Sequence, residues 1–233
     1  MHGPVTAHPQ HARLLDTTSE LQKGLLRIPF ARAAVEGRLT LDEYVAFLMQ
    51  AYHHVKHTVP LLMAAGSRIG PDRPGLQQGF AAYIEEERGH EQWILDDIAA
   101  CGGDPDAVRA SQPGMAADVL VAYAYDVITR RDPIGFLGMV HVLEGTSVLA
   151  ASQAADALRV SLGLPEQAFR YLSSHGALDL DHVDFFADLL ETLDPTEVDL
   201  VIRSAGVFFT LYGDVLRSLS PHDHQSVQEP TSC

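Results

Sequence analysis

The chain has 233 residues, of which 46% are hydrophobic and 20% are charged, and this composition argues against a disordered protein. Lys and Arg total 16 against 31 Asp and Glu, so the net charge of −15 disfavours nucleic-acid binding through a basic surface. Cys101 and Cys233 lie too far apart to build a disulfide framework or a zinc knuckle. The N-terminus lacks the pattern of a signal peptide, and no apolar run approaches the ~20 residues of a membrane span. We therefore expect a cytoplasmic protein without membrane contacts.

Apolar residues recur with helical spacing almost throughout, and the alternation typical of strands is nearly absent. A capping box from Thr40 to Glu43 begins one helix, and the run from Gly102 to Pro105 ends another. In chain order, the pattern predicts helices over residues 9–27, 40–61, 73–101, 115–131, 133–161, 165–175, 178–193 and 195–219. We expect an all-α, bundle-like single domain of seven or eight helices over residues 1–219, followed by a polar tail over 220–233.

A first candidate site lies in the acidic run around Glu87 and His90. These two residues have the spacing that lets both side chains point the same way from a helix, as oxygen and nitrogen ligands of one iron. Glu86, one turn before His90, is an alternative ligand. Taken alone, the run also fits a solvated acidic face that carries a chance histidine.

A second candidate consists of His175, Asp179 and His182. At ~100° per residue, their offsets return to the same helix face, so the three side chains form one stripe if the helix continues through Gly176. Three ligand-type residues in register favour metal binding over a structural histidine.

Glu144 is the third candidate, in the middle of a long apolar helix where an unpaired carboxylate would cost several kcal/mol. Gly145 costs ~1 kcal/mol relative to Ala in a helix, which indicates that another group approaches closely there. The alternatives are an exposed stripe or a pair between Glu144 and His141. Apolar neighbours such as Val140 and Leu143 make exposure the weaker alternative.

A histidine-rich segment follows Tyr52 and is less specific. His53 and His57 have the spacing of metal ligands on a helix, but no carboxylate accompanies them. Ordinary hydrogen bonds in a partly buried position explain these histidines best. His53, His54, Lys56 and His57 are nevertheless candidates for contact with the substrate or with the metal ligands.

Three pieces, each on its own expected helix, form one combined pattern: Glu87-x2-His90, Glu144 and His175-x3-Asp179-x2-His182. This pattern resembles that of the haem-oxygenase-like di-iron oxidase and oxygenase superfamily. Further similarity lies in Ile28–Phe30, Gly37–Glu43, His90–Asp97 and Cys101–Pro105. The resemblance spans most of the chain, roughly residues 28 to 182, and implies a haem-oxygenase-like helical bundle.

The resemblance also implies a ligand set and partners. It assigns Glu87, His90 and His175 to one iron, and Glu144, Asp179 and His182 to a second iron. Two Fe(II) ions per chain, O2 as co-substrate and a homodimer are therefore expected. Beyond the metal ligands, no catalytic residue is predicted.

Proteins with this fold include a fatty acid decarboxylase, para-aminobenzoate synthases and oxygenases of amino acids, besides thiaminase II and pyrroloquinoline quinone synthase. The resemblance to thiaminase is incomplete, because Ala51 replaces its Asp and Gly138–Val148 contains no cysteine. The sacrificial Lys of the para-aminobenzoate synthases is missing from Ser147–Ala157.

We therefore expect a non-haem iron oxidoreductase, with two irons or one, that uses O2 to oxidise a small organic substrate. A fatty acid, an amino acid or an amine fits this chemistry. The alternative is a metal-free small-molecule-binding protein of the same fold, similar to thiaminase or to pyrroloquinoline quinone synthase.

Overall fold

The computed structural model describes residues 8–219, and the side chains of all of these except residues 148–149 and 175–182. This part of the chain contains eleven α-helices, two short 3-10 helices and no strand. The first six helices are α1 (Pro9–Leu26), α2 (Pro29–Val35), α3 (Leu41–Val55), α4 (Thr58–Gly66), α5 (Pro74–Glu87) and α6 (His90–Ala100). The others are α7 (Pro105–Ala110), α8 (Met115–Arg130), η1 (Pro133–Phe136), α9 (Leu137–Leu162), η2 (Glu166–Phe169), α10 (Arg170–Glu191) and α11 (Pro195–Ser218). The all-α prediction is confirmed, and the predicted tail over 220–233 lies outside the described residues.

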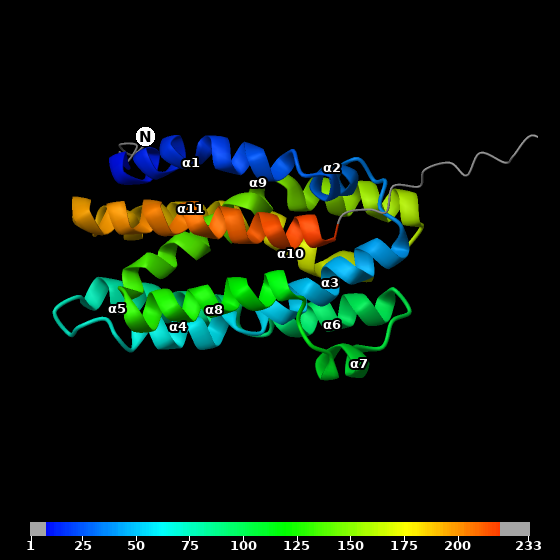
Figure 1. Ribbon diagram of the computed structural model, residues 1–233, viewed down its shortest axis with the longest axis horizontal. Coiled ribbons are helices and arrows are strands. Elements are labelled where there is room, and N and C mark those ends of the chain that lie inside the picture. Colours follow the sequence, from blue (N-terminus) through cyan, green and yellow to red (C-terminus); the bar gives the residue numbers. More distant parts are fainter. Residues whose placement is uncertain (1–7, 220–233) are drawn as a thin grey trace, which may run out of the picture.

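The long helices lie along the length of the molecule in two groups (Figure 1). In one group, α9 packs against α10 and α11, and α1 packs against α11. In the other, α3 packs against α6 and α4 against α5. Helix α8 contacts α11 of the first group and both α3 and α4 of the second, so it joins the two.

Several helix ends follow from capping residues in the sequence. Thr40 and Asp194 each form a capping box, at the starts of α3 and α11. Such a cap pairs backbone N–H groups that the first helical turn leaves without a partner. Asp194 thereby accounts for the predicted start of α11, and the bounds predicted for α1 and α8, which have no side-chain cap, also agree with the structure to within a residue or two.

Close packing joins α9 to α11 at Gly138. A Cβ atom at this position would lie 2.6 Å from the backbone N of Ala205, so only glycine permits this approach of the two helices.

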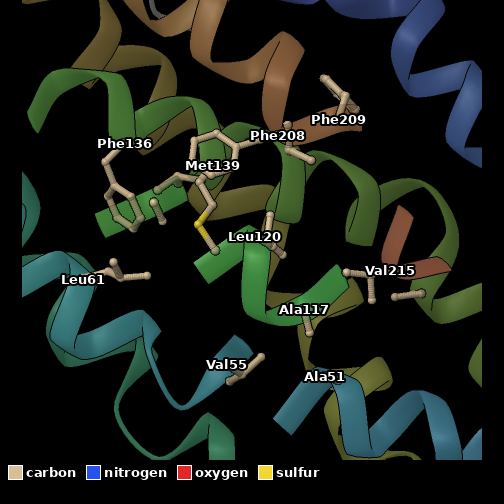
Figure 2. Packing of buried hydrophobic residues seen from close by; sticks show 14 of the residues in the cluster. Ala51, Val55, Leu61, Ala117, Leu120, Phe136, Met139, Phe208, Phe209 and Val215 are labelled. Carbon is tan, nitrogen blue, oxygen red and sulfur yellow. The ribbon is translucent and has the colours of Figure 1, made fainter. Parts of the chain in front are cut away.

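Figure 2 shows the neighbouring core, in which Phe136 and Met139 lie on the side that faces Leu61. These side chains are almost completely buried, and their burial stabilises the packing of η1, which precedes α9, against α4.

Two predicted helices are each broken into two. The helix expected over 40–61 is interrupted at Lys56 and His57, because Pro60 has no N–H to donate to the Lys56 carbonyl. The helix expected over 73–101 is interrupted at Gly89, whose φ of 91° is a left-handed conformation that glycine adopts readily. These two breaks, together with the short helices α2 and α7 that the sequence pattern did not predict, give the described part more helices than the seven or eight expected.

The opposite difference occurs near the C-terminus. Separate helices were expected over 165–175 and 178–193, whereas α10 runs without a break through Gly176. A single glycine costs a helix only ~1 kcal/mol, and no proline or capping residue accompanies it here. The condition for a single stripe of His175, Asp179 and His182 is therefore met by the backbone.

No single helix in residues 8–219 is long and apolar enough to cross a membrane. The segments Pro133–Ser147 and Ala150–Leu162, bent by 42° relative to each other, meet that test only when counted together.

Candidate metal centre

Two carboxylates from distant parts of the chain line one cavity of about 610 Å³. Glu87 reaches it from the last residue of α5, and Glu144 reaches it from the middle of α9. The other lining residues, most of them apolar, are His54, Val55, Thr58, Leu62, Tyr83, Phe136, Met139, Val140, Leu143, Ser147, Tyr171 and Tyr212. We call this space the carboxylate cavity. Its two glutamates are what the sequence predicted as ligands on separate helices.

Glu87 and His90 meet across a helix break, which differs from the continuous helix that the sequence suggested. Glu87 ends α5, His90 begins α6, and the left-handed Gly89 turns the chain between them. His90 Nδ1 lies 3.0 Å from Glu87 Oε2, and because a carboxylate only accepts, Nδ1 is the donor. The neutral ring then carries its lone pair on Nε2. This is the way in which proteins orient an imidazole for a metal.

The ring of His90 is held on its other side as well. It is 2% exposed and lies against Trp93, with the two ring centroids 4.2 Å apart. The guanidinium carbon of Arg170 lies 4.5 Å from the Trp93 ring centroid, so α10 contacts the same cluster. His90 is therefore fixed in position, although it does not itself line the carboxylate cavity.

The structure separates the two alternatives on α5. Glu86 is exposed and does not line the carboxylate cavity, whereas the Glu87 side chain is only 13% exposed and does. A helix directs neighbouring side chains about 100° apart, so only one of the two can face the interior. Of the two, Glu87 is the one placed to contact a ligand in the cavity.

Tyr83 is a residue of this cavity that the sequence analysis missed. It is 1% exposed, and among the described residues its hydroxyl has no hydrogen-bond partner. Burial, together with the charges of Glu144, Glu86 and Glu87, raises the pKa of this hydroxyl well above its usual value. Its spacing to Glu87, one helical turn, is the one feature that the sequence offers, and this spacing does not distinguish Tyr83 from an ordinary core residue. A buried hydroxyl without a partner normally indicates an absent water, ion or ligand.

The four residues of the histidine-rich segment point to different places. His54 lines the carboxylate cavity, and its Nδ1 donates to the Gln50 carbonyl at 3.0 Å, which leaves the lone pair of the neutral ring on Nε2. His57 Nδ1 lies 3.3 Å from the Tyr125 hydroxyl. Burial and the nearby Lys56 lower the pKa of His57, so its ring is neutral at pH 7. Only His54 is thus a cavity residue.

His53 and Lys56 bridge α3 to the end of α7. His53 Nε2 lies 2.9 Å from Ser111 Oγ, and Lys56 Nζ lies 3.2 Å from His53 Nδ1. Because an ammonium only donates, His53 accepts at Nδ1 and donates to Ser111 at Nε2. Burial and Lys56 lower the pKa of His53, which keeps the ring neutral. Neither side chain lines the carboxylate cavity.

The close approach predicted at Gly145 comes from α1. Gln22 Nε2 donates to the Gly145 carbonyl at 2.9 Å, and a Cβ atom at Gly145 would lie 3.3 Å from that nitrogen. On the preceding turn, His141 Nε2 lies 2.9 Å from the Thr18 hydroxyl, and burial lowers the pKa of His141 to about 4. Helix α1 thereby fixes the segment of α9 that carries Glu144.

His175, Asp179 and His182 lie on α10, and their side chains fall outside the described residues. The backbone of α10 packs against α5, α6 and α9, the three helices that carry Glu87, His90 and Glu144. Among the side chains that the structure does describe, no three His, Cys, Asp or Glu residues are close enough to hold a metal ion.

The sequence matches the model of a known family over residues 45–212, which is most of the chain. That family is described as iron-containing redox enzymes. The chain belongs to the iron-containing redox enzyme family. No curated protein sequence matches it at a significant level.

Three solved structures share the fold of this chain at low sequence identity. A protein of unknown function from Shewanella denitrificans, with a haem oxygenase-like fold, is 22% identical with a TM-score of 0.80, covering 89% of this chain and 90% of that one. A TenA homologue from Pseudomonas syringae pv. tomato is 11% identical with a TM-score of 0.78, covering 94% and 97%. Haem oxygenase-1 from the cyanobacterium Synechocystis, in complex with haem, is 9% identical with a TM-score of 0.71, covering 90% and 91%. At these identities, the likeness shows the haem oxygenase-like fold.

The candidate site contains side chains of the types that bind iron. Glu87 and Glu144 offer carboxylate oxygens in a mostly apolar cavity. His90 offers an imidazole whose orientation is set by its hydrogen bond to Glu87. Carboxylate and imidazole are the ligand types of non-haem iron sites.

Proposed function

We propose that the chain is a non-haem iron oxidoreductase that uses O2 to oxidise a small organic substrate in the carboxylate cavity. The observation that carries the proposal is the meeting of Glu87 and Glu144 in one largely apolar space. Two carboxylates that share a largely apolar space repel each other, and a bound cation offsets this repulsion. Membership of the iron-containing redox enzyme family makes iron the cation to expect.

We propose six ligands: Glu87, His90, Glu144, His175, Asp179 and His182. They are sufficient for two Fe(II) ions per chain, or for one if the second is weakly held. The packing of α10 on α5, α6 and α9 supports this set, because it brings the backbones of all the ligand-bearing helices together. Bound iron would supply electrons to O2 and open coordination positions for O2 and substrate.

The chain's own residues have separate tasks in this proposal. Leu62, Val140 and Leu143 line the cavity and exclude bulk water from the reacting groups. Glu87 holds the His90 ring in one tautomer and orientation. The Tyr83 hydroxyl is a donor inside the cavity, and the His54 ring, held by its hydrogen bond to the Gln50 carbonyl, forms part of the wall.

The test is O2 uptake by protein that has been loaded anaerobically with Fe(II). We expect uptake to accelerate with the true substrate in a panel of fatty acids, amino acids and aromatic amines, and to be lost after chelation. Glu144→Ala should abolish it, whereas Glu85→Ala on the exposed face of α5 should not. Turnover of thiamin or an aminopyrimidine by the chelated protein would instead establish the metal-free alternative.

A homodimer that works in the cytoplasm is a further prediction. Light scattering tests the assembly, and a monomer would contradict it.

A further inference from the structure

A second cavity, of about 720 Å³, adjoins the first between α2, α3, α9 and α11. Its walls are made almost entirely of leucine, alanine, valine and aromatic side chains. No Asp, Glu, Lys, Arg or His is among its described lining residues. We call it the apolar cavity.

Alanines account for much of the space. Ala31 and Ala34 face it from α2, and Ala150, Ala151 and Ala154 face it from α9. Larger apolar residues at these positions would fill the gap and extend the core. Apart from hydroxyl groups such as those of Thr146 and Ser147, the walls offer few partners to ordered water, so the space is suited to hydrocarbon groups.

The apolar cavity and the carboxylate cavity share part of their walls. Ser147, Tyr171 and Tyr212 line both of them. Tyr171 is held there by its backbone N–H, which donates to the buried Asp97 carboxylate at 2.9 Å. A molecule that passes these three residues would have one part among hydrocarbon side chains and the other beside Glu87 and Glu144.

We propose that the apolar cavity binds the unbranched hydrocarbon tail of the substrate while the polar end lies in the carboxylate cavity. The oxidation of the polar end in the carboxylate cavity rests on the proposed function. Binding of the hydrocarbon tail in the apolar cavity requires no iron. The site would disfavour molecules that are charged at both ends, such as dicarboxylic acids and diamines, because one charge would be buried without a partner.

Calorimetric titration of the iron-free, chelated protein tests the tail directly. The ligands are the straight-chain carboxylic acids from hexanoic to dodecanoic acid and the matching primary amines. Each methylene that enters the cavity should tighten binding about fourfold, from ~0.8 kcal/mol per buried CH2. Such a rise in either series supports the proposal, and the tighter series identifies the polar end. Affinities independent of chain length in both series would overturn it.

Variants that fill the apolar cavity locate the tail. Ala154→Leu on α9 and Ala34→Leu on α2 should each reduce affinity for the longest ligand by tenfold or more and leave the shortest unaffected. Ala81→Leu, at an exposed position on α5, is the matched control and should bind all lengths like the parent. Two folded variants, checked by circular dichroism, that still bind the longest ligand at full strength would contradict the proposal. Tail binding without iron-dependent O2 uptake would instead overturn only the proposed function.

Discussion

The carboxylate of Asp97 on α6 accepts a hydrogen bond of 2.9 Å from the backbone N–H of Tyr171 in the first turn of α10. The neighbouring N–H of Arg170 donates to the same carboxylate at 3.1 Å. Asp97 is completely buried and so caps a helix that is not its own. The pair ties α6, which begins at His90, to the helix that carries His175, Asp179 and His182.

This cap predicts a pH dependence of stability. Burial raises the pKa of Asp97 from 3.8 to about 7, so the folded protein favours the protonated form more than the unfolded chain does. The contribution of Asp97 to stability is then fully present below pH ~4 and is lost as the pH rises to about 7. Asp97→Asn should remove this part of the pH dependence and cost about 1 kcal/mol at pH 5. Urea denaturation across this range tests it, and unchanged pH dependence in the variant would contradict it.

Tyr83→Phe should stabilise the iron-free protein by about 1 kcal/mol, because it removes a buried hydroxyl that has no partner among the described residues. Tyr44→Phe is the matched control. The Tyr44 hydroxyl, equally buried, donates to the Ala168 carbonyl at 2.8 Å, so its loss should destabilise by a similar amount. Thermal denaturation of the chelated variants shows whether each substitution raises or lowers the stability of the protein. Destabilisation by Tyr83→Phe would mean that its hydroxyl is already satisfied.

Glu87→Gln and Glu144→Gln should each lower the iron bound per chain by half or more, because each removes a charged oxygen ligand. Glu86→Gln should have little effect, since Glu86 is exposed and does not line the carboxylate cavity. Glu85→Gln, at an exposed position of the same helix, is the control. Metal analysis after anaerobic loading and desalting provides the measurement. Equal loading of all four variants would refute the ligand assignment.

Substitutions of the clustered histidines should differ in effect. His54→Phe changes the wall of the carboxylate cavity and should reduce substrate-stimulated O2 uptake by tenfold or more. His57→Phe should leave uptake within about twofold of the parent, because His57 lies against Tyr125. A large loss of uptake in His57→Phe, with iron loading intact, would place the substrate on the other side of α3.

The sequence predicts the helical class and several helix ends because apolar spacing and caps such as Thr40 and Asp194 are local signals. The break at Gly89 was missed, because a glycine inside a helical pattern does not reveal whether its φ is positive. Glu87 and Glu144 were identifiable by residue type and spacing. Tyr83 was not, since a tyrosine one turn from a glutamate looks like any core residue until the opposite wall is known. His53 and His54 likewise differ only in which neighbour each faces, and that is set by tertiary packing.

Anomalous diffraction at the iron edge, from crystals prepared anaerobically with Fe(II), tests the central claim most directly. The account predicts an anomalous peak in the carboxylate cavity, within bonding distance of the Glu87 and Glu144 carboxylates and of ligands on α10. A second, nearby peak would establish the di-iron form. No peak in this cavity at saturating Fe(II), or a peak bound only elsewhere on the protein, would contradict the account.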